Sequence, residues 1–321
     1  MTLRLGVVGL GMMGRHHARI LQDLDGVEFV GAADHFGDRF GVVKHAPVFD
    51  SYQDLLSLGI DAVIVAVPTE HHHEVGMAVA ESGAHALVEK PIAASSSEAR
   101  EMVAAFEAKE LILAIGHVER FNPALLELKR RLVAGDLGTV FSISTTRIGP
   151  FPDRIVDVGV IKDLGTHDLD IVRWIAGEDI TKYAGFTSHQ MGNVHEDLVS
   201  IAGQTPSGIT INIQTNWVTP VKRRSVLVVG QKGAFEADML TSDLTYYANN
   251  AIPTEWNVVA GIRGVSEGDV IRYALRKPEP LVSELTAFVS AINTGELEGF
   301  ATALDGLAAL LIAETILGDE S

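Results

Sequence analysis

The stretch from Leu3 to Gly14 constrains the fold of this chain more than any other part of the sequence. It reads LRLGVVGLGMMG, so that a short apolar strand runs into glycines spaced as G-x-G-x-x-G, and the residues that follow have the apolar spacing of a helix. In such a strand–turn–helix unit the glycines allow a tight turn, the approach of the backbone to a pyrophosphate, and close packing of helix on strand. The N–H groups at the helix start then face the phosphates. The stretch predicts a dinucleotide site formed by Gly9, Leu10, Gly11, Met12, Met13 and Gly14.

A second feature supports this prediction and indicates which dinucleotide binds. Residues 27–33, VEFVGAA, form a predicted strand that ends at Asp34, 20 positions after Gly14. An acid at this place binds the ribose hydroxyls and repels a 2′-phosphate, which favours NAD as the cofactor over NADP. His35 is not typical of a phosphate site, whereas Arg39 keeps NADP open as the less favoured cofactor.

Composition excludes several functional classes. The chain has 321 residues, of which 47% are apolar and 21% charged, as in globular proteins with room for two domains. Its formal net charge of −17 argues against nucleic acid and anionic membranes as partners. Cysteine is absent, which excludes a thiol nucleophile and fits a cytoplasmic location. We find no signal-peptide pattern at the N-terminus and no apolar run as long as a membrane span.

The order of predicted elements indicates two domains. Residues 1–118 alternate strands and helices, which predicts an α/β Rossmann domain with a doubly wound parallel sheet. Residues 119–321 are predicted to form an α+β domain with a large open, mostly antiparallel sheet. The strands expected in the first domain, besides the two above, are 61–67, 84–88 and 111–116. Its expected helices are 51–58, 70–82 and 97–109, with an irregular segment and a short helix in 36–48.

In the second domain the pattern begins with a helix at 121–134. A strand at 139–148, a proline-rich loop at 149–157 and a helix within 160–176 follow, and then strands at 181–189, 198–204, 209–217, 224–229, 234–239 and 244–247. Helices are expected at 280–294 and 302–318. In 209–216 the odd-numbered residues are apolar or Thr and the even-numbered ones are polar, so one face of the sheet is expected to be buried and the other solvated or paired with another subunit.

Ligands of doubly wound sheets bind at the carboxyl ends of the strands. Three predicted ends carry informative residues: Pro68-Thr69 with His72, Glu89-Lys90-Pro91, and the segment 117–120. A lysine directly after a buried strand is suited to bind a developing alkoxide, and a solvated loop lysine is the alternative for Lys90.

A second group of polar residues lies in the segment 162–170, KDLGTHDLD. Asp163 and His167 are four positions apart, so on a helix a carboxylate would share a face with an imidazole. Histidine suits the removal of a hydroxyl proton near neutral pH. The alternatives are a surface pair or a metal site, but further ligands are not in suitable spacing. The run 71–73, three histidines, does not point one way on a helix, and we predict no metal.

Taken together, these motifs resemble the glucose–fructose oxidoreductase / inositol dehydrogenase (Gfo/Idh/MocA) family. The similar parts are the glycine turn, Pro68-Thr69 with His72, Glu89-Lys90-Pro91, and Asp163-x-Gly165-x-His167, and the resemblance extends over nearly the whole chain. Many members have Asn where Thr69 stands, and a hydroxyl can replace that hydrogen bond.

The resemblance implies a Rossmann domain that binds NAD(P) and a substrate domain built on an open sheet, which is commonly the interface of a homo-oligomer, a dimer or tetramer. It implies that Lys90 is catalytic and that Asp163 and His167 face the nicotinamide. It further implies that Pro68, Thr69, His72, Glu89 and Lys90 belong to the cofactor site.

Two further stretches, 116–123 and 147–160, resemble the UDP-N-acetylglucosamine 3-dehydrogenase subgroup. That subgroup oxidises the 3-hydroxyl of the sugar to a ketone. Cationic side chains that could bind a diphosphate are predicted at Arg120, Arg147, Arg154 and Lys162, with ordinary loop and helix-end charges as the alternative. The expected function is therefore an NAD-dependent dehydrogenase of a sugar or nucleotide sugar. The alternatives are a dehydrogenase of a free polyol such as inositol and a non-catalytic NAD-binding regulator.

Overall fold

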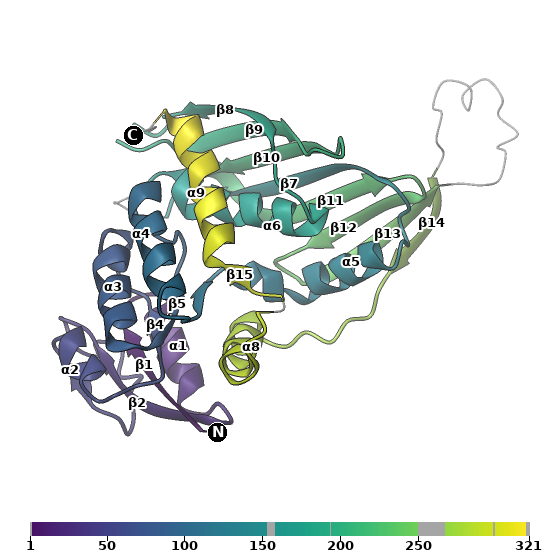
Figure 1. Ribbon diagram of the computed structural model, residues 1–321. Helices are drawn as coiled ribbons and strands as arrows, with labels where there is room; N and C mark the ends of the chain where they lie inside the picture. The colour runs from purple at the N-terminus through teal and green to yellow at the C-terminus, as the bar shows by residue number, and fades with distance from the viewer. Residues whose placement is uncertain (1, 153–157, 193, 250–266, 298, 319–321) are drawn as a thin grey trace, which may run out of the picture. The chain divides into compact units, whose positions relative to one another are not determined.

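The computed structural model describes residues 2–152, 158–192, 194–249, 267–297 and 299–318. The chain forms two compact units (Figure 1): Met1–Phe121 with Glu279–Ser321, and Asn122–Pro278. From sequence, residues 279–321 were assigned to the second domain, but they pack with the first unit. The pattern along the chain could not show this, because a helix carries no signal of which sheet it will cover.

The first unit is built on a seven-stranded sheet with the order β15-β6-β5-β4-β1-β2-β3. All neighbouring pairs are parallel except β15 with β6, which is antiparallel. Without β15 this is the usual strand order of dinucleotide-binding folds, which confirms the predicted doubly wound sheet. The strands are β1 (Leu3–Val8), β2 (Val27–Ala33), β3 (Val48–Phe49), β4 (Ala62–Val65), β5 (His85–Val88), β6 (Leu113–Ile115) and β15 (Ala301–Thr302).

Helices cover both faces of this sheet. One hydrophobic cluster joins it to α1 (Gly14–Leu21) and α8 (Pro280–Thr294), and the other joins it to α2 (Tyr52–Leu56), α3 (His72–Ser82), α4 (Ser96–Glu107) and α9 (Ala303–Leu317). Two short 3₁₀ turns, η1 (Thr69–His71) and η2 (Val118–Phe121), follow strand ends. The short helix expected within 36–48 is absent from this described segment, where the chain makes turns before β3.

The second unit is built on an eight-stranded sheet with the order β14-β13-β12-β11-β7-β10-β9-β8. Only β10 and β7 pair in parallel, so the predicted mostly antiparallel sheet is confirmed. Its strands are β7 (Val140–Pro150), β8 (Lys182–Ser188), β9 (Leu198–Gln204), β10 (Thr210–Asn216), β11 (Val218–Gly230), β12 (Gly233–Asp238), β13 (Asp243–Asn249) and β14 (Glu267–Arg272). Its helices are α5 (Pro123–Val133), the π-helix η3 (Ile161–Gly165) and α6 (Thr166–Ala176).

The two faces of the second sheet differ as the alternation predicts. Ile211, Ile213 and Thr215 are buried on the face that carries α5, α6 and η3 (Figure 1), whereas Asn212 and Gln214 point outward and are exposed. Asn216 was expected on the exposed face, yet it is buried. Its side-chain oxygen accepts hydrogen bonds from the Val218 N–H and the Thr219 hydroxyl. These bonds connect the end of β10 to the start of β11.

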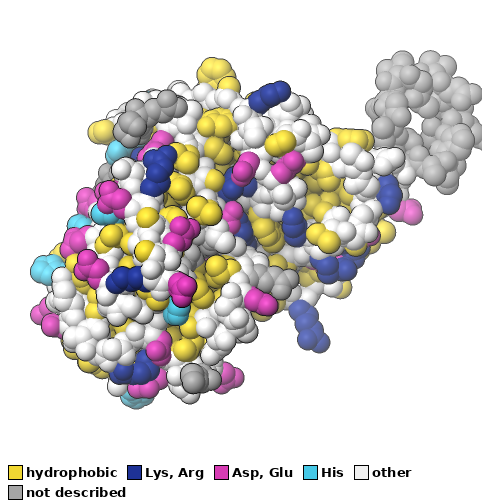
Figure 2. Space-filling view, in the orientation of Figure 1, with side chains coloured by type: hydrophobic (Ala, Val, Ile, Leu, Met, Phe, Trp, Pro, Cys, Tyr) yellow, Lys and Arg dark blue, Asp and Glu magenta, His cyan; other side chains and the backbone are white. Residues whose placement is uncertain are grey.

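The surface shows how the negative charge is distributed. On the face seen in Figure 2, Asp and Glu side chains are interspersed with Lys and Arg. Among the described residues, every helix is too short or too polar to cross a membrane.

Candidate functional site

The glycine turn lies between β1 and α1, and two of its glycines are required by space. Gly9 has φ +92°, a left-handed conformation that side chains rarely adopt, and a Cβ there would lie 2.6 Å from the carbonyl oxygen of Ala66. A Cβ on Gly14 would lie 1.7 Å from the carbonyl oxygen of Gly9. At Gly11, by contrast, a Cβ would meet no described atom within 4 Å. Packing against described atoms therefore does not require a glycine at this position.

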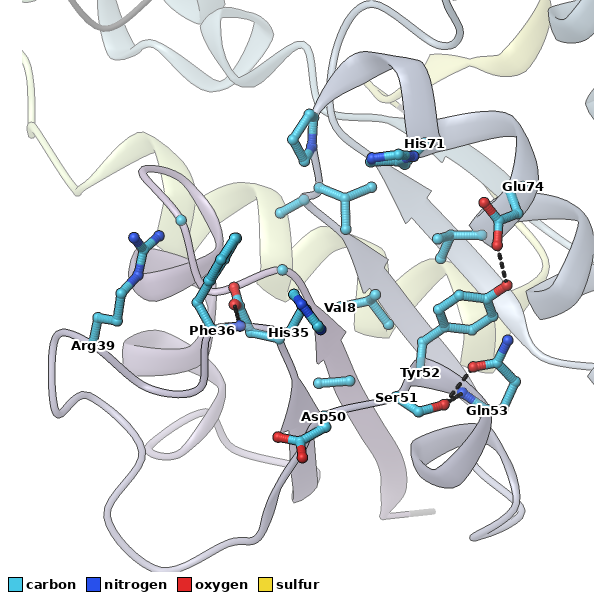
Figure 3. A pocket seen from close by; sticks show the side chains of 18 residues that line it. Val8, His35, Phe36, Arg39, Asp50, Ser51, Tyr52, Gln53, His71 and Glu74 are labelled. Atoms are coloured by element: carbon cyan, nitrogen blue, oxygen red, sulfur yellow. Dashed lines mark hydrogen bonds between the residues drawn. The ribbon is translucent and has the colours of Figure 1, made fainter.

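A cavity of about 610 Å³ opens beside this turn (Figure 3). Four residues predicted for the cofactor site line it: Gly9, Gly11, Asp34 and Pro68. Its size is within the range of ligand pockets, and the open space at Gly11 fits the approach of a pyrophosphate. The residues present thus fit a dinucleotide, with the phosphates over the turn at the start of α1.

Asp34 is oriented by backbone hydrogen bonds on both carboxylate oxygens. Its Oδ2 accepts from the Leu10 N–H at 2.7 Å, and its Oδ1 accepts from the Phe36 N–H at 2.8 Å. Each oxygen keeps a further lone pair, so the carboxylate can still accept from a ribose diol. One bond reaches the glycine turn, and Asp34 therefore also fixes that turn relative to the end of β2.

The sequence reasoning missed the opposite wall of the cavity. It is formed by residues that follow β3 and begin α2, and by residues of η1 and the first turn of α3: Asp50, Ser51, Tyr52, Gln53, His71 and Glu74 (Figure 3). The Tyr52 hydroxyl donates to Glu74 at 2.7 Å, and burial together with this bond raises the pKa of Tyr52 to about 12. Ligands bind at the carboxyl ends of strands, so a predicted β3 would have indicated these residues. β3 has only two residues, however, and gives no periodic pattern in the sequence.

On the outer side of the cavity, the Arg39 guanidinium lies over the Phe36 ring, 5.0 Å from its centre. Both residues line the cavity and Phe36 is 70% exposed. The stacked pair offers a flat surface to a planar group. The remaining turn residues differ in exposure, since Leu10 is buried and Met12 is 47% exposed.

His72 holds two strand-end loops together. It is 1% exposed, with Nδ1 2.8 Å from the Pro91 carbonyl oxygen and Nε2 3.0 Å from that of Val67. Burial lowers the pKa of His72, and its interactions with these carbonyls oppose the shift. Because both ring nitrogens face protein carbonyls, His72 joins the loop after β4 to the loop after β5. Thr69, also predicted for the cofactor site, begins η1 on the same loop.

Glu89 and Lys90 follow the end of β5, as predicted. Glu89 is 7% exposed, and its Oε1 accepts from Nε2 of His17, at 2.8 Å, on the buried side of α1. Burial alone would raise the pKa of Glu89. The hydrogen bond and charge of His17, with the charges of Lys90 and His72, outweigh burial and hold this pKa below its usual value. Lys90 is half-buried beside this ionised carboxylate.

Arg120, predicted to bind the substrate, has partners within the first unit. Its side chain is buried, Nη1 donates to the Phe300 carbonyl at 2.7 Å, and Nη2 lies 3.3 Å from Asp305 Oδ2. Asp305 also caps α9 together with Thr302. Arg120 thus ties η2 to the C-terminal part of the first unit, which explains its charge without a ligand.

In the second unit, Asp163 and His167 lie at the junction of a π-helix with an α-helix. Asp163 is in η3 and is 8% exposed, and His167 is half-buried in the first turn of α6. The sequence predicted a regular helix here, whereas η3 has the wider π geometry, which is frequent at functional sites. The Thr166 hydroxyl donates to the Lys162 carbonyl at 2.9 Å and covers one carbonyl of that turn.

Glu196 holds the beginning of η3. Its Oε1 accepts from the Ile161 N–H and its backbone oxygen from the Val160 N–H, both at 3.0 Å. A Cβ on Gly159 would lie 1.9 Å from this carboxylate, so glycine is required there. Sequence reasoning gave no role to Glu196, because it lies far along the chain from the helix that it supports.

Arg147 is paired inside the second unit and is not placed as a substrate residue. It is 1% exposed, and its Nε donates to Oδ2 of Asp168, at 3.1 Å, which is fully buried. Thr215 donates to the same oxygen at 3.2 Å. The pair fixes α6 on the sheet. Lys162 is half-buried in η3, and Arg154 lies outside the described residues.

The three histidines at 71–73 point to different partners. His71 lies 3.7 Å from Glu70, His73 lies 2.9 Å from Glu101, and His72 is buried as described above. Within the described part of the chain, no group of three or more potential ligands is arranged to hold a metal ion.

Comparisons with known proteins agree with this architecture. Residues 3–117 match the model of the GFO_IDH_MocA oxidoreductase family with an NAD-binding Rossmann fold, and residues 125–236 match the GFO/IDH/MocA C-terminal domain. Inositol 2-dehydrogenase 2 of Saccharopolyspora erythraea is 29% identical over 99% of this chain and 93% of its own. The scyllo-inositol 2-dehydrogenase (NAD(+)) of Bacillus subtilis is 30% identical over 68% of each chain.

A third relative differs from these in its substrate. UDP-N-acetylglucosamine 3-dehydrogenase of Acidithiobacillus ferrooxidans is 28% identical over 90% of this chain and 88% of its own. A solved structure of that enzyme, GnnA, is similar with a TM-score of 0.85 and 25% identity, covering 98% of this chain and 96% of the other. The match of residues 3–117 to the oxidoreductase family with an NAD-binding Rossmann fold confirms the predicted Rossmann domain and NAD as the cofactor.

Proposed function

Because this chain belongs to the Gfo/Idh/MocA family of NAD-binding oxidoreductases, we propose that it oxidises a secondary hydroxyl of a sugar or nucleotide sugar. The best candidate is the 3-hydroxyl of UDP-N-acetylglucosamine. The observation that carries the proposal is the placement of Asp163 and His167 four residues apart at the junction of η3 and α6, because a carboxylate and an imidazole can together supply the base that alcohol oxidation needs.

Each polar group has a role in this proposal. His167 accepts the hydroxyl proton of the sugar, and Asp163 orients the imidazole and stabilises its charged form. Lys90 hydrogen-bonds the reacting oxygen as negative charge develops on it. Bound NAD⁺ supplies the acceptor for the hydride that leaves the carbon, so the secondary alcohol becomes a ketone. Asp34 holds the adenosine ribose, and the Gly9–Gly14 turn holds the pyrophosphate.

The choice of substrate has two supports. The first is the similarity to the UDP-N-acetylglucosamine 3-dehydrogenase of Acidithiobacillus ferrooxidans. The second is the presence of cationic residues that could bind a diphosphate. Of the four predicted from sequence, Arg154 and Lys162 are assigned this role here. Inositol is the rival substrate because two relatives of similar identity act on it by name.

A substrate panel separates these candidates. Purified protein is incubated with NAD⁺ and either UDP-N-acetylglucosamine, free N-acetylglucosamine or myo- and scyllo-inositol, and NADH formation is followed by absorbance. We expect the largest kcat/KM for the nucleotide sugar. A larger kcat/KM for an inositol would replace this substrate, and no turnover with any alcohol would contradict a dehydrogenase.

Variants test the roles of the two catalytic residues. Lys90→Ala and His167→Ala are each expected to lower kcat by about 10²- to 10⁴-fold, the usual contribution of a positioned acid or base, while NAD⁺ binding persists. Lys109→Ala and His189→Ala, which remove exposed side chains of the same types, serve as matched controls. Near-normal turnover in either active-site variant would remove that residue from the mechanism.

The exposed face of the second sheet supports a homo-oligomer. Phe186 is 78% exposed and lies in register with Ser200, and Leu227 is 39% exposed beside Ser144. A flat face with small, polar and a few apolar side chains suits pairing with a second copy. Light scattering should give a dimer or tetramer for the native chain and a smaller species for Phe186→Glu. A native monomer would contradict this part of the proposal.

A further inference from the structure

The first unit contains a cluster of buried titratable groups that includes the residue before Lys90. The proposed chemistry does not use this cluster. It consists of His17 on α1, Glu89 after β5 and Glu284 on α8, with exposures of 0%, 7% and 0%. Burying ionisable groups is costly unless they are paired or neutral. Their presence here therefore needs a physical reason.

The two carboxyl groups of the cluster have different environments. Glu89 accepts from His17 at 2.8 Å. Both oxygens of Glu284 and the Nδ1 of His17 have no hydrogen-bond partner among the residues that the structure describes. Burial raises the pKa of Glu284 well above its usual value, and the charge of Glu89 raises it further. Interactions with His17, Lys90 and His72 hold the pKa of Glu89 below its usual value, so Glu284 is the more readily protonated of the two carboxyl groups.

Four titratable groups act on Glu89. His17 on α1 is hydrogen-bonded to it, and the charges of Lys90, its neighbour in the chain, of His72 at the start of α3 and of Glu284 on α8 interact with its carboxylate. Gly116, at the end of β6, leaves room for the carboxylate, because a Cβ there would lie 3.2 Å from Oε2. Glu89 is thus a buried carboxylate held from α1, and it directly precedes Lys90 in the chain.

We propose that Glu89 is a positioning residue for Lys90, that His17 holds its carboxylate, and that Glu284 is a neutral acid beside this pair. The inference rests on the proposed function, since it assigns a partner to the lysine of that mechanism. His17 lies on the helix that follows the glycine turn, so the pair joins the cofactor-binding helix to the lysine loop. A carboxylate held from α1 fixes where the ammonium of Lys90 can lie relative to the dinucleotide.

A matched pair of isosteric variants tests the charge assignment. Glu89→Gln removes the charge that attracts Lys90, whereas Glu284→Gln replaces one neutral group with another. We expect Glu89→Gln to lower kcat by about 10- to 100-fold, the cost of a misplaced catalytic group, with the Kd for NAD⁺ changed less than about threefold. Glu284→Gln should keep kcat within about twofold of the native value. Equal losses in the two variants would overturn the proposal.

The pH dependence of kcat gives a readout that a purely structural role would not move. Removing a nearby negative charge lowers the pKa of the bases that face it, so a limb of the pH profile should move to lower pH by about one unit in Glu89→Gln. The profile of Glu284→Gln should match the native one. An unmoved limb in Glu89→Gln would contradict the charged role of this residue.

Infrared spectroscopy tests the proton without any cofactor or substrate. A protonated carboxylic acid gives a carbonyl band separate from that of carboxylates, and we expect this band at neutral pH in the native protein and in a folded Glu89→Gln. It should be lost in Glu284→Gln. Persistence of the band in Glu284→Gln, or its absence from the native protein, would overturn the assignment of Glu284.

Two further variants keep the proposal testable if Glu89→Gln does not fold. His17→Gln retains a side-chain donor towards Glu89, and His17→Leu removes it, so the leucine variant should lose more kcat. Equal kcat values would contradict the role of His17. Failure of the proposed function is distinct, because it would appear as normal turnover in Lys90→Ala, whereas failure of this inference leaves Lys90→Ala inactive and Glu89→Gln native-like.

Discussion

The first unit positions its candidate residues mainly with backbone, whereas the second unit positions its candidate residues with side chains. In the first, the glycine turn is shaped by positions where a Cβ would collide with backbone oxygens, and Asp34 is oriented by backbone N–H groups. In the second, Asp163 lies in η3, which is held by Glu196, and His167 lies in α6, which the Arg147–Asp168 pair fixes on the sheet. The backbone part follows from short-range sequence, and the side-chain part requires contacts between distant residues.

The two units also treat buried charge differently. The Arg147–Asp168 pair is a buried ion pair of opposite charges with a further hydrogen bond from Thr215. Glu89 and Glu284 are like groups, and burial together with the charge of Glu89 holds the pKa of Glu284 well above its usual value, which favours its neutral form. Opposite charges thus brace the second unit, whereas a buried neutral acid makes the stability of the first unit depend on pH.

The largest effect on stability is expected from breaking the buried brace. Asp168→Ala leaves the Arg147 guanidinium buried and uncompensated, and removing one partner of such a pair typically costs about 3–5 kcal/mol. The exposed pair Arg4–Glu28, with side chains 39% and 60% exposed, is the matched control. Glu28→Ala should cost less than about 1 kcal/mol, measured by urea denaturation. Equal costs would mean that the brace does not support η3 and α6.

A comparison of two glycine variants tests whether each glycine is required by contacts with the backbone or by the binding of NAD⁺. Gly14→Ala places a methyl group against the Gly9 carbonyl and should destabilise the fold by about 3 kcal/mol or prevent folding. Gly11→Ala meets no described atom within 4 Å, so it should fold normally and bind NAD⁺ at least about tenfold more weakly. Calorimetry and thermal melting measure both, and unchanged NAD⁺ affinity in Gly11→Ala would contradict the phosphate site.

A parallel comparison in the second unit tests the support of η3. Gly159→Ala places a methyl group 1.9 Å from the Glu196 carboxylate and should cost about 1–3 kcal/mol, because the cap of η3 must move. Gly165→Ala, whose nearest contact would be the flexible Ile161 side chain at 3.1 Å, should cost less. Urea denaturation orders the two variants. A larger cost at Gly165 would show that Glu196 does not hold η3.

The smallest predicted effect is the change in the free energy of unfolding per pH unit that Glu284 causes. Its folded-state pKa lies above the unfolded value, so its contribution to stability is complete below the unfolded pKa and is lost as pH rises through the folded pKa. Relative to Glu284→Gln, the native protein should therefore lose up to about 1.4 kcal/mol per pH unit above about pH 5. Denaturation at several pH values measures this slope. The exposed Glu107→Gln should show no such slope, and a flat difference for Glu284→Gln would contradict a neutral buried acid.

Local signals predicted most of the elements. The bounds of the strand 27–33 and of the helix 280–294 agree with the structure, since apolar periodicity and the proline at the helix start are read directly from sequence. The π geometry of η3 and the two-residue β3 were missed, because neither leaves a periodic pattern. The buried partners of Arg120 and Arg147 were also not predicted, since a charge in a sequence does not reveal whether it is already paired.

The sequence by itself determined the Rossmann domain, NAD as the cofactor, and which lysine, aspartate and histidine to examine. These depend on glycine spacing, an acid at a fixed distance, and motif residues at strand and helix ends, all of which are short-range. Only the tertiary structure decided that residues 279–321 complete the first unit and that Arg120 and Arg147 are braces. It alone brought His17 and Glu284 beside the Glu89 that precedes Lys90. Pairing between distant segments settles such questions, because burial and the proximity of charges decide which group ionises and which is available to a ligand.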